Sequence, residues 1–287
     1  MDFLQQIING LMIGGLYALV ALGISLVFGL TGMINFAHGE IVMLGGYLTF
    51  SLAQRGVPFV LALGCVLLAG AVLGFLLDRT TFRFTRSEPM NGLVISLGLI
   101  LIFQSLVMTF YGGDPYTMDV LFPGALQLEG LSFSYQKVLT VGVTALLIGA
   151  FGYFLVGTRS GRALRALAQE SEAAIYVGIP VERYIVLSMA IGTALAAVAG
   201  ALFAALFSLT PFVGTALTAK GFIVVALGGL GSAGGTIVAG FLLGIIEALG
   251  AGYISPAFTE AYGLLLFLIV LSVRPQGLFG VSDRVKL

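Results

Sequence analysis

The sequence predicts an all-α, polytopic transmembrane helical bundle of about eight or nine membrane segments, some of them short or broken. Of its 287 residues, 59% are apolar and only 9% are charged, and the mean hydropathy is +1.10. A soluble domain carries about 25% charged residues, so this chain lacks the charge to cover a water-facing surface. Its apolar runs are long and continuous, whereas the strands of a transmembrane barrel alternate apolar and polar residues over about ten positions.

The composition also excludes several functions. An ordinary soluble enzyme, a nucleic-acid binder with a basic face and a disordered regulator all need more charge than this chain has. The single cysteine cannot form an internal bridge, which argues against a disulfide scaffold.

The membrane segments follow from the apolar runs, because a spanning helix needs about 20 mostly apolar residues. The runs place candidate segments at about residues 8–30, 37–53, 58–77, 91–111, 137–157, 184–208, 217–230, 235–252 and 260–273. The second and seventh are short or interrupted, so eight or nine crossings are expected.

The whole chain, 1–287, is expected to be a single membrane-spanning domain. The longest polar connections, 112–136 and 158–183, have about 25 residues each, and chains below about 40 residues rarely fold alone. Any step that captures a solute in solution or consumes energy is therefore expected in another polypeptide.

The basic residues indicate the orientation. Ten of the 13 gather in three regions, which the positive-inside rule assigns to the cytoplasm: Arg79, Arg83 and Arg86; Arg159, Arg162, Arg165 and Arg183; Arg274, Arg284 and Lys286. The connection 112–136 has three acidic residues and no basic one, so it is expected outside. The C-terminus is then cytoplasmic. Nine crossings place the N-terminus outside and eight place it inside, and residues 1–54 contain no basic residue that decides between them.

A first polar interruption lies at residues 29–40, where Asn35, His38 and Glu40 fall within six positions between glycines. At membrane depth each group needs a partner or a watery cavity, and a broken helix there can direct its termini at a substrate. A short cytoplasmic turn, with Asn35 and His38 capping helix ends, explains the pattern equally well. A metal site is not expected, because zinc takes three or four ligands.

A second interruption, the glycine-rich run 228–235, precedes Glu247. We expect most of these glycines to allow tight helix packing, although two such segments also occur in transporters with internal repeats. An unpaired carboxylate in hydrocarbon costs a few kcal/mol. Glu247 is therefore expected to face the bundle interior, to pair with a polar group or to be protonated.

The cytoplasmic stretch 159–183 is amphipathic, with apolar residues near helical spacing. Its basic residues, Arg162 and Arg165, come before its acidic residues. Because Glu170 and Glu172 come second, the order is the reverse of what the dipole of one helix favours.

Two short helices, broken near residues 169–171, fit this charge order better, and Gly178 and Pro180 supply a stop signal. The apolar side of such an element lies in the lipid headgroups or docks into a groove on a partner protein. The physical arguments favour the two equally.

No catalytic set is present in the sequence. It has no P-loop motif, no Gly-x-Ser-x-Gly elbow and no histidine pair for a metalloprotease. His38 has no obvious nucleophile beside it. We therefore expect a protein that is not an enzyme and that needs no cofactor.

Several motifs together resemble the branched-chain amino acid ABC transporter permeases of the LivH type. The most specific is GMINFAHGE at residues 32–40, preceded by GLYALVALG at 15–23. Further matching segments are GRALRA (161–166), EAA (172–174) with GI (178–179), LGGLGS (227–232), GIIEA (244–248) and RPQGLFG (274–280). The resemblance spans nearly the whole chain, and the same fold group includes permeases for urea and short-chain amides.

The resemblance implies an ATP-driven importer for branched-chain or related hydrophobic amino acids in the bacterial inner membrane, working by alternating access. The implied partners are a homologous, LivM-like permease subunit, two cytoplasmic ATPases, a periplasmic solute-binding protein and membrane lipid, with no nucleic acid. The segment 159–183 becomes the coupling segment that seats on the ATPase. Its implied contact residues are Arg162, Arg165, Glu170, Glu172, Ala173, Ala174 and Gly178.

Within this family, Asn35, His38, Glu40 and Glu247 are the candidates for a polar lining of the solute pathway. Two rival functions use the same features. A self-sufficient channel or proton-coupled carrier would use Glu40, His38 and Glu247 as a relay. An intramembrane enzyme acting on a lipid is disfavoured, because no nucleophile–base pair or metal set is present.

Overall fold

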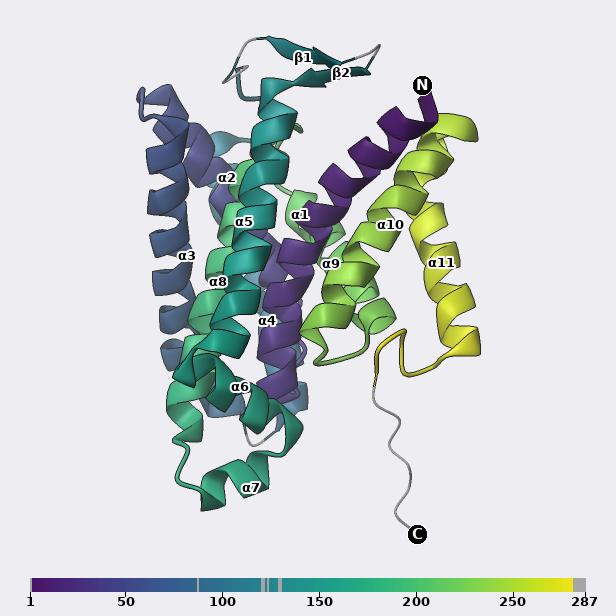
Figure 1. Ribbon diagram of the computed structural model, residues 1–287. Helices are drawn as coiled ribbons and strands as arrows, with labels where there is room; N and C mark the ends of the chain where they lie inside the picture. Colours follow the sequence, from purple (N-terminus) through teal and green to yellow (C-terminus); the bar gives the residue numbers. More distant parts are fainter. Residues whose placement is uncertain (1, 87, 120–121, 123, 129–130, 281–287) are drawn as a thin grey trace.

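The computed structural model describes residues 2–86, 88–119, 122, 124–128 and 131–280, which form a bundle of helices (Figure 1). The helices are α1 (Asp2–Thr31), α2 (His38–Gln54), α3 (Phe59–Thr80), α4 (Pro89–Tyr111), α5 (Tyr135–Gly157), α6 (Arg159–Gln169), α7 (Ser171–Tyr176), α8 (Val181–Ala204), α9 (Val213–Gly228), α10 (Ala233–Tyr253) and α11 (Thr259–Val273). Short 3-10 turns, Phe82–Thr85 and Pro256–Phe258, precede α4 and α11.

Each of the nine predicted membrane segments corresponds to one helix of the described chain. Seven of the described helices are long and apolar enough to cross a membrane: α1, α3, α4, α5, α8, α10 and α11 taken with the turn before it. The segments predicted to be short are α2, with 17 residues, and α9, with 16. The predicted fold class is confirmed.

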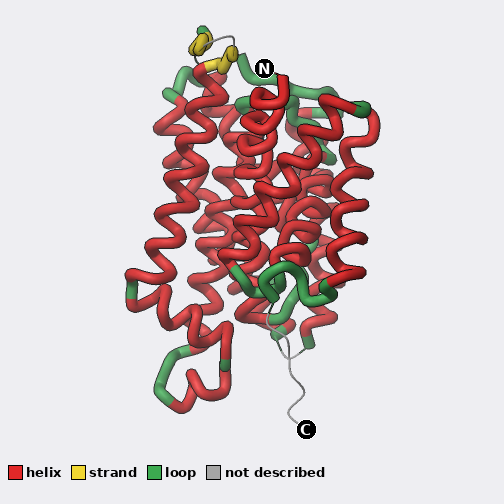
Figure 2. Tube along the Cα trace, turned by 45° about the vertical axis from the view of Figure 1, so that its right-hand side comes forward, coloured by secondary structure: helices red, strands yellow, loops and turns green. Residues whose placement is uncertain are grey.

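The two ends of the bundle differ. Strands β1 (Ala125–Leu128) and β2 (Leu131–Ser134) pair antiparallel in a hairpin at the end where α1 begins, and α6 and α7 project from the other end (Figures 1 and 2). We refer to these as the hairpin end and the α6–α7 end. α11 finishes toward the α6–α7 end. The first and last membrane helices thus have their outer termini at opposite ends, as an odd number of crossings requires.

The core is built around α1 and α8. In the most apolar stretch of each, 72% of the residues are buried, against 22% in α4 and α5 and 6% in the α11 segment. The central helices are thus surrounded by other helices, and the outer helices present apolar side chains to their surroundings.

Close glycine contacts join α1 to α10 and α3 to α8. A Cβ on Gly14 of α1 would lie 2.7 Å from the carbonyl oxygen of Gly240 on α10. On α3, a Cβ on Gly70 would lie 2.8 Å from the carbonyl oxygen of Thr193 on α8. In Figure 1, α1 and α3 run away from the hairpin end, whereas α8 and α10 run toward it, so helices α1–α3 and α8–α10 form two sets of opposite direction. The middle helices, α2 and α9, are the short ones. This arrangement agrees with the internal-repeat alternative.

The hairpin end also differs from the sequence prediction. The connection 112–136 was expected to be a polar loop, and it contains the hairpin. The same connection is tied to the link between α8 and α9, because Tyr116 and Leu209 exchange two backbone hydrogen bonds of 2.9 and 2.7 Å. The β-propensity of a single short segment is a weak signal, because it depends on the strand with which the segment pairs. The linear sequence does not show which segments pair.

Candidate functional site

Residues 32–37 form an irregular link between α1 and α2 that is enclosed by other helices. The backbone N–H of Phe36 donates to Ser96 Oγ on α4 over 3.1 Å, and its carbonyl oxygen accepts from Thr218 Oγ1 on α9 over 3.1 Å. Asn35 is 7% exposed, and its Oδ1 accepts from the N–H of Ala37 over 3.0 Å. The burial favours the broken helix. Ala37 is the N-cap residue of α2 and no side chain of the described residues caps this helix, so the capping role of Asn35 and His38 in the turn alternative is not observed.

His38 is packed between α1 and α8. Its side chain is 1% exposed, and a Cβ on Gly23 of α1 would lie 2.6 Å both from His38 Nε2 and from the carbonyl oxygen of Gly192 on α8. Nε2 has no hydrogen-bond partner among the residues that the structure describes. The ring thus fills the contact between the two central helices.

Glu40 joins three helices at the first turn of α2. Its Oε1 accepts from Gln104 Nε2 on α4 over 3.0 Å and from Thr215 Oγ1 on α9 over 2.9 Å. Gln104 Nε2 also donates to Thr215 Oγ1 over 2.9 Å. The other carboxylate oxygen, Oε2, is buried and has no hydrogen-bond partner in the described part of the chain. We call Glu40, Gln104 and Thr215 the Glu40 cluster.

Helix termini provide the Glu40 cluster with positive electrostatic potential. Glu40 lies in the first turn of α2, and a Cβ on Gly214, in the first turn of α9, would lie 2.5 Å from Oε2. The N-terminus of a helix carries partial positive charge and stabilises an anion nearby. Two half-length helices thus direct their N-termini at one carboxylate, which is how broken helices form polar sites inside transporters.

Glu247 has a cationic partner. It is 2% exposed on α10, forms an ion pair with Lys220 of α9, and accepts a hydrogen bond of 2.9 Å from the hydroxyl of Tyr17 on α1. Gly263 of α11 packs against the same carboxylate. The prediction that Glu247 faces the interior and pairs is confirmed, and we call Tyr17, Lys220 and Glu247 the Glu247 triad.

The glycine-rich run 228–235 forms the tight turn between α9 and α10. Gly229 and Gly231 have φ angles of +97° and +79°, which favour glycine, and Ser232 Oγ caps α10 by accepting from the N–H of Gly235 over 3.2 Å. Gly228 and Gly235 have the expected packing role, because their backbones are in contact, whereas Gly229 and Gly231 serve the turn.

The stretch 159–183 contains the two short helices that the charge order predicts. α6 ends at Gln169 and α7 begins at Ser171, with Glu170 between them in an extended conformation, φ −153° and ψ 91°. α7 ends at Tyr176, and Gly178 follows with a φ angle of +83°. The predicted break and stop are confirmed.

α6 is anchored and α7 projects. Leu164 and Leu167 of α6 are 1% and 4% exposed, so this face of α6 packs on the bundle. On α7 and just after it, Ile175, Tyr176 and Val177 are 56%, 89% and 77% exposed. An apolar tip thus extends from the α6–α7 end (Figure 1).

The predicted contact residues divide between these two environments. Arg162, Arg165, Glu170, Glu172, Ala173 and Gly178 are exposed, and Ala174 is buried at 4%.

A cavity of about 830 Å³ lies behind α6. Its wall includes Arg165 and Ala168 of α6, Ser25 and Gly29 of α1, and Ser232 in the turn before α10. α6 therefore faces α1 and the α9–α10 turn across this cavity.

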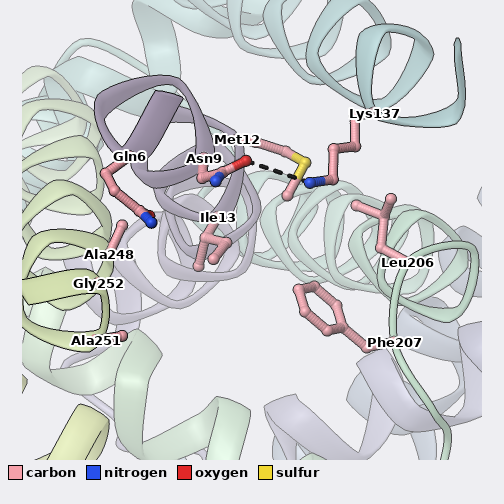
Figure 3. A pocket seen from close by; sticks show the side chains of 10 residues that line it. All are labelled: Gln6, Asn9, Met12, Ile13, Lys137, Leu206, Phe207, Ala248, Ala251 and Gly252. Atoms are coloured by element: carbon pink, nitrogen blue, oxygen red, sulfur yellow. Dashed lines mark hydrogen bonds between the residues drawn. The ribbon is translucent and has the colours of Figure 1, made fainter. Parts of the chain in front are cut away.

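A smaller pocket, of about 410 Å³, opens on the hairpin side of the bundle (Figure 3). Gln6 and Asn9 of α1 face it together with Lys137 of α5, whose Nζ donates to Asn9 Oδ1 over 3.3 Å. Phe207, in the link between α8 and α9, lines the opposite wall. The pocket is polar on one side and apolar on the other.

Four residues of these sites were missed by sequence reasoning: Tyr17, Gln104, Thr215 and Lys220. Lys220 is a lone lysine inside the apolar run 217–230, and Gln104 is a polar residue inside the run 91–111. Such isolated polar residues were the available signal, since each needs a partner at membrane depth.

Comparison with known proteins gives one family. A family model described as the branched-chain amino acid transport system permease component matches residues 6–273. LivH of Escherichia coli K12, described as a high-affinity branched-chain amino acid transport system permease protein, is 35% identical and aligns with 99% of this chain and 97% of its own length. BraD of Pseudomonas aeruginosa, with the same description, is 33% identical over 99% of this chain and 98% of its own.

LivM of Escherichia coli K12, also described as a permease protein of that high-affinity system, is 26% identical over 93% of this chain and 68% of its own length. No solved structure matches the chain.

Proposed function

The chain belongs to the family of branched-chain amino acid transport system permease components, and we propose that it is a membrane subunit of an ATP-driven importer. The solute is a branched-chain or related hydrophobic amino acid, and the membrane is the bacterial inner membrane. The whole chain acts as one membrane-spanning domain. ATP hydrolysis occurs in partner chains, because this sequence has no P-loop motif.

The observation that carries the ATP-driven part of the proposal is the projecting tip formed by Ile175, Tyr176 and Val177. These three apolar side chains are more than half exposed at the end of the bundle that carries most of the basic residues. An exposed apolar helix of this kind fits a groove on another protein. The positive-inside rule places this end, and with it the C-terminus, in the cytoplasm, where an ATPase is available.

A homologous second permease completes the membrane part of the importer. The similarity of this chain to LivH and also to LivM, which are named as components of one system, supports a pair of related subunits. Two ATPases and a periplasmic solute-binding protein are the further partners. The acidic connection 112–136, at the hairpin end, is the surface offered to the binding protein.

The position of α6 beside the core supports a mechanism of alternating access. ATP-driven closure of the ATPases displaces α7, α6 transmits the movement to α1 and to the α9–α10 turn, and the two inverted helix sets tilt relative to each other. The ATPases drive the change only if they bind the two permease states with different affinity. Within the pathway, weak polar contacts are sufficient, since tight binding would slow release. Of the four predicted lining residues, Glu40 has the surroundings best suited to this role.

The coupling assignment is tested by replacing Glu172 with lysine. Glu172 is exposed in the first turn of α7, and a lysine there reverses the charge offered to the ATPase and opposes the helix dipole. We expect the tagged variant to lose co-purifying ATPase from detergent-solubilised membranes, and ATP-driven uptake to fall at least about tenfold, equivalent to about 1.4 kcal/mol.

The matched control for this test is Asp114→Lys, which makes the same charge change at an exposed position of the hairpin end. Its ATPase is expected to co-purify at the wild-type level. Normal uptake and normal ATPase association in Glu172→Lys would refute the coupling role.

A further inference from the structure

The Glu40 cluster reaches the outside of the bundle at membrane depth. Glu40 itself is fully enclosed, but Gln104 is half-buried and Thr215 is exposed. Their neighbours on the same surface are apolar: Leu101 on α4 is 66% exposed and Phe212, just before α9, is 56% exposed. The cluster is thus a polar spot on an outward-facing surface of α4 and α9, beside the exposed apolar side chains of Leu101 and Phe212.

The depth of this spot follows from helix geometry. Gln104 comes 15 residues after Pro89 and 7 before Tyr111, the two ends of α4. At a rise of 1.5 Å per residue, it lies about 22 Å from one end and about 10 Å from the other. It is therefore well inside a hydrocarbon layer about 30 Å thick. Polar groups at this depth are stable only where protein or a watery cavity covers them, and the second permease subunit is the cover that the proposed function supplies.

The charge of Glu40 is not neutralised by a basic residue. The described part of the chain contains three ion pairs, and none of them includes Glu40, in contrast to Glu247. Neutral donors, the Gln104 amide and the Thr215 hydroxyl, occupy Oε1, and Oε2 has no partner among the described residues. The helix termini of α2 and α9 supply only partial positive charge.

An ammonium group is the ligand that this arrangement fits best. It carries a full positive charge and three N–H donors, and a charge-assisted hydrogen bond is about twice as strong as a neutral one. It therefore competes well with Gln104 and Thr215 for Oε1 and also satisfies Oε2. Gln104, a flexible side chain at the surface of the cluster, is the group that turns aside.

We propose that the Glu40 cluster is the station where the α-ammonium group of the transported amino acid is held during passage, between this chain and the second permease subunit. The proposal rests on the proposed function and adds the residues that recognise the solute. It also gives a basis for selectivity, because urea and short-chain amides carry no positive charge that Glu40 attracts.

The test uses the complete importer, purified from native membranes through a tag on this chain and reconstituted with its binding protein, with ATP-driven leucine uptake as the readout. Glu40→Gln preserves shape and removes charge, and uptake is expected to fall about tenfold or more. Glu40→Asp preserves the charge on a shorter side chain and is expected to retain more uptake than Glu40→Gln. A purely structural role for the hydrogen bonds predicts the opposite order.

Thr215→Val tests the cluster without changing a charge. It is expected to lose less uptake than Glu40→Gln. The matched control is Thr109→Val on α4, where an exposed threonine hydroxyl bonds only to the carbonyl of Ser105 in its own helix. Its uptake is expected to equal that of the wild type. Melting temperature and co-purification of the partners show that each complex is intact.

Wild-type uptake in Glu40→Gln, or more uptake in Glu40→Gln than in Glu40→Asp, overturns the inference and leaves the proposed function standing. If the wild-type complex itself takes up no amino acid, the proposed function is what fails. Should Glu40→Gln not assemble, the comparison of Thr215→Val with Thr109→Val decides, and equal uptake in the two overturns the inference.

Discussion

At the scale of single residues, two carboxylates inside the bundle are stabilised in different ways. Glu247 forms an ion pair with Lys220 and accepts from Tyr17, so its charge is compensated where it lies. Glu40 is surrounded by neutral donors and two helix N-termini. A compensated charge serves to hold helices together, and an uncompensated one remains available to a cationic group. This difference supports the proposal that the Glu40 cluster faces the solute, and it favours a structural role for the Glu247 triad.

The structural role of the Glu247 triad predicts a large loss of stability in Lys220→Met. Removing one partner of a buried ion pair leaves the other charge uncompensated, at a cost of about 3–5 kcal/mol. Thermal unfolding of the detergent-solubilised protein is the measurement. The double variant Lys220→Met/Glu247→Gln is expected to lose less than the two single variants combined, because it leaves no buried charge.

The matched control for this prediction is Lys137→Met. Lys137 is half-buried, and in the described part of the chain its Nζ donates only to Asn9 Oδ1, so its removal leaves no buried carboxylate without a partner. Its unfolding temperature is expected to stay close to that of the wild type. An equally small change in Lys220→Met would show that the ion pair contributes nothing to stability.

Residue-level partners were the part of the site that the sequence could not supply. The rule that a carboxylate in hydrocarbon needs a partner correctly predicts that Glu247 is paired, but it does not identify Lys220, 27 positions earlier on another helix. Gln104 is likewise separated from Glu40 by 64 positions. Periodicity reports which residues share a face of one helix, and it contains no information about contacts between helices.

At the scale of elements, the sequence predicts well what depends on length and local pattern. All nine apolar segments are helices, and the two predicted to be short are α2 and α9. The break between α6 and α7 follows from the order of charges around Glu170, a local electrostatic signal. The hairpin in the connection 112–136 was missed, because its two four-residue strands depend on pairing with each other.

Contact between elements depends on glycines, and Gly200 of α8 gives the sharpest test. A Cβ there would overlap the carbonyl oxygen of Val42 on α2, a backbone atom that cannot turn aside. Gly200→Ala is therefore expected to lower stability by about 1–3 kcal/mol or more, measured as a lower unfolding temperature. Because α2 carries Glu40, solute uptake is expected to fall with it.

The control for Gly200→Ala is Gly149→Ala on α5, where a Cβ meets nothing within 4 Å. Alanine favours a helix interior over glycine by about 1 kcal/mol in water, so the control is expected to be neutral or slightly stabilising. If both variants have the same unfolding temperature, close packing of α8 on α2 is not what holds these helices.

At the scale of the whole molecule, the two inverted helix sets, α1–α3 and α8–α10, extend from the ends of the bundle to the Glu40 cluster at its centre. α6 packs near α1 and the α9–α10 turn at one end, and the Glu40 cluster lies where α2 and α9 begin inside the bundle. In the proposed mechanism, movement at α7 is transmitted to the helices that hold the carboxylate. The composition identified a membrane bundle, while the convergence of α2, α4 and α9 on one side chain required the three-dimensional structure.

Leucine uptake into proteoliposomes tests most directly whether this chain transports solute only when partner ATPases drive it. Two preparations are compared: the complex purified through a tag on this chain, with its binding protein, and the same chain purified alone. We expect uptake against a gradient by the complex, with ATP required, and no flux through the chain alone. Leucine flux through the chain alone, without ATPase or ATP, would contradict it and favour a self-sufficient channel or carrier.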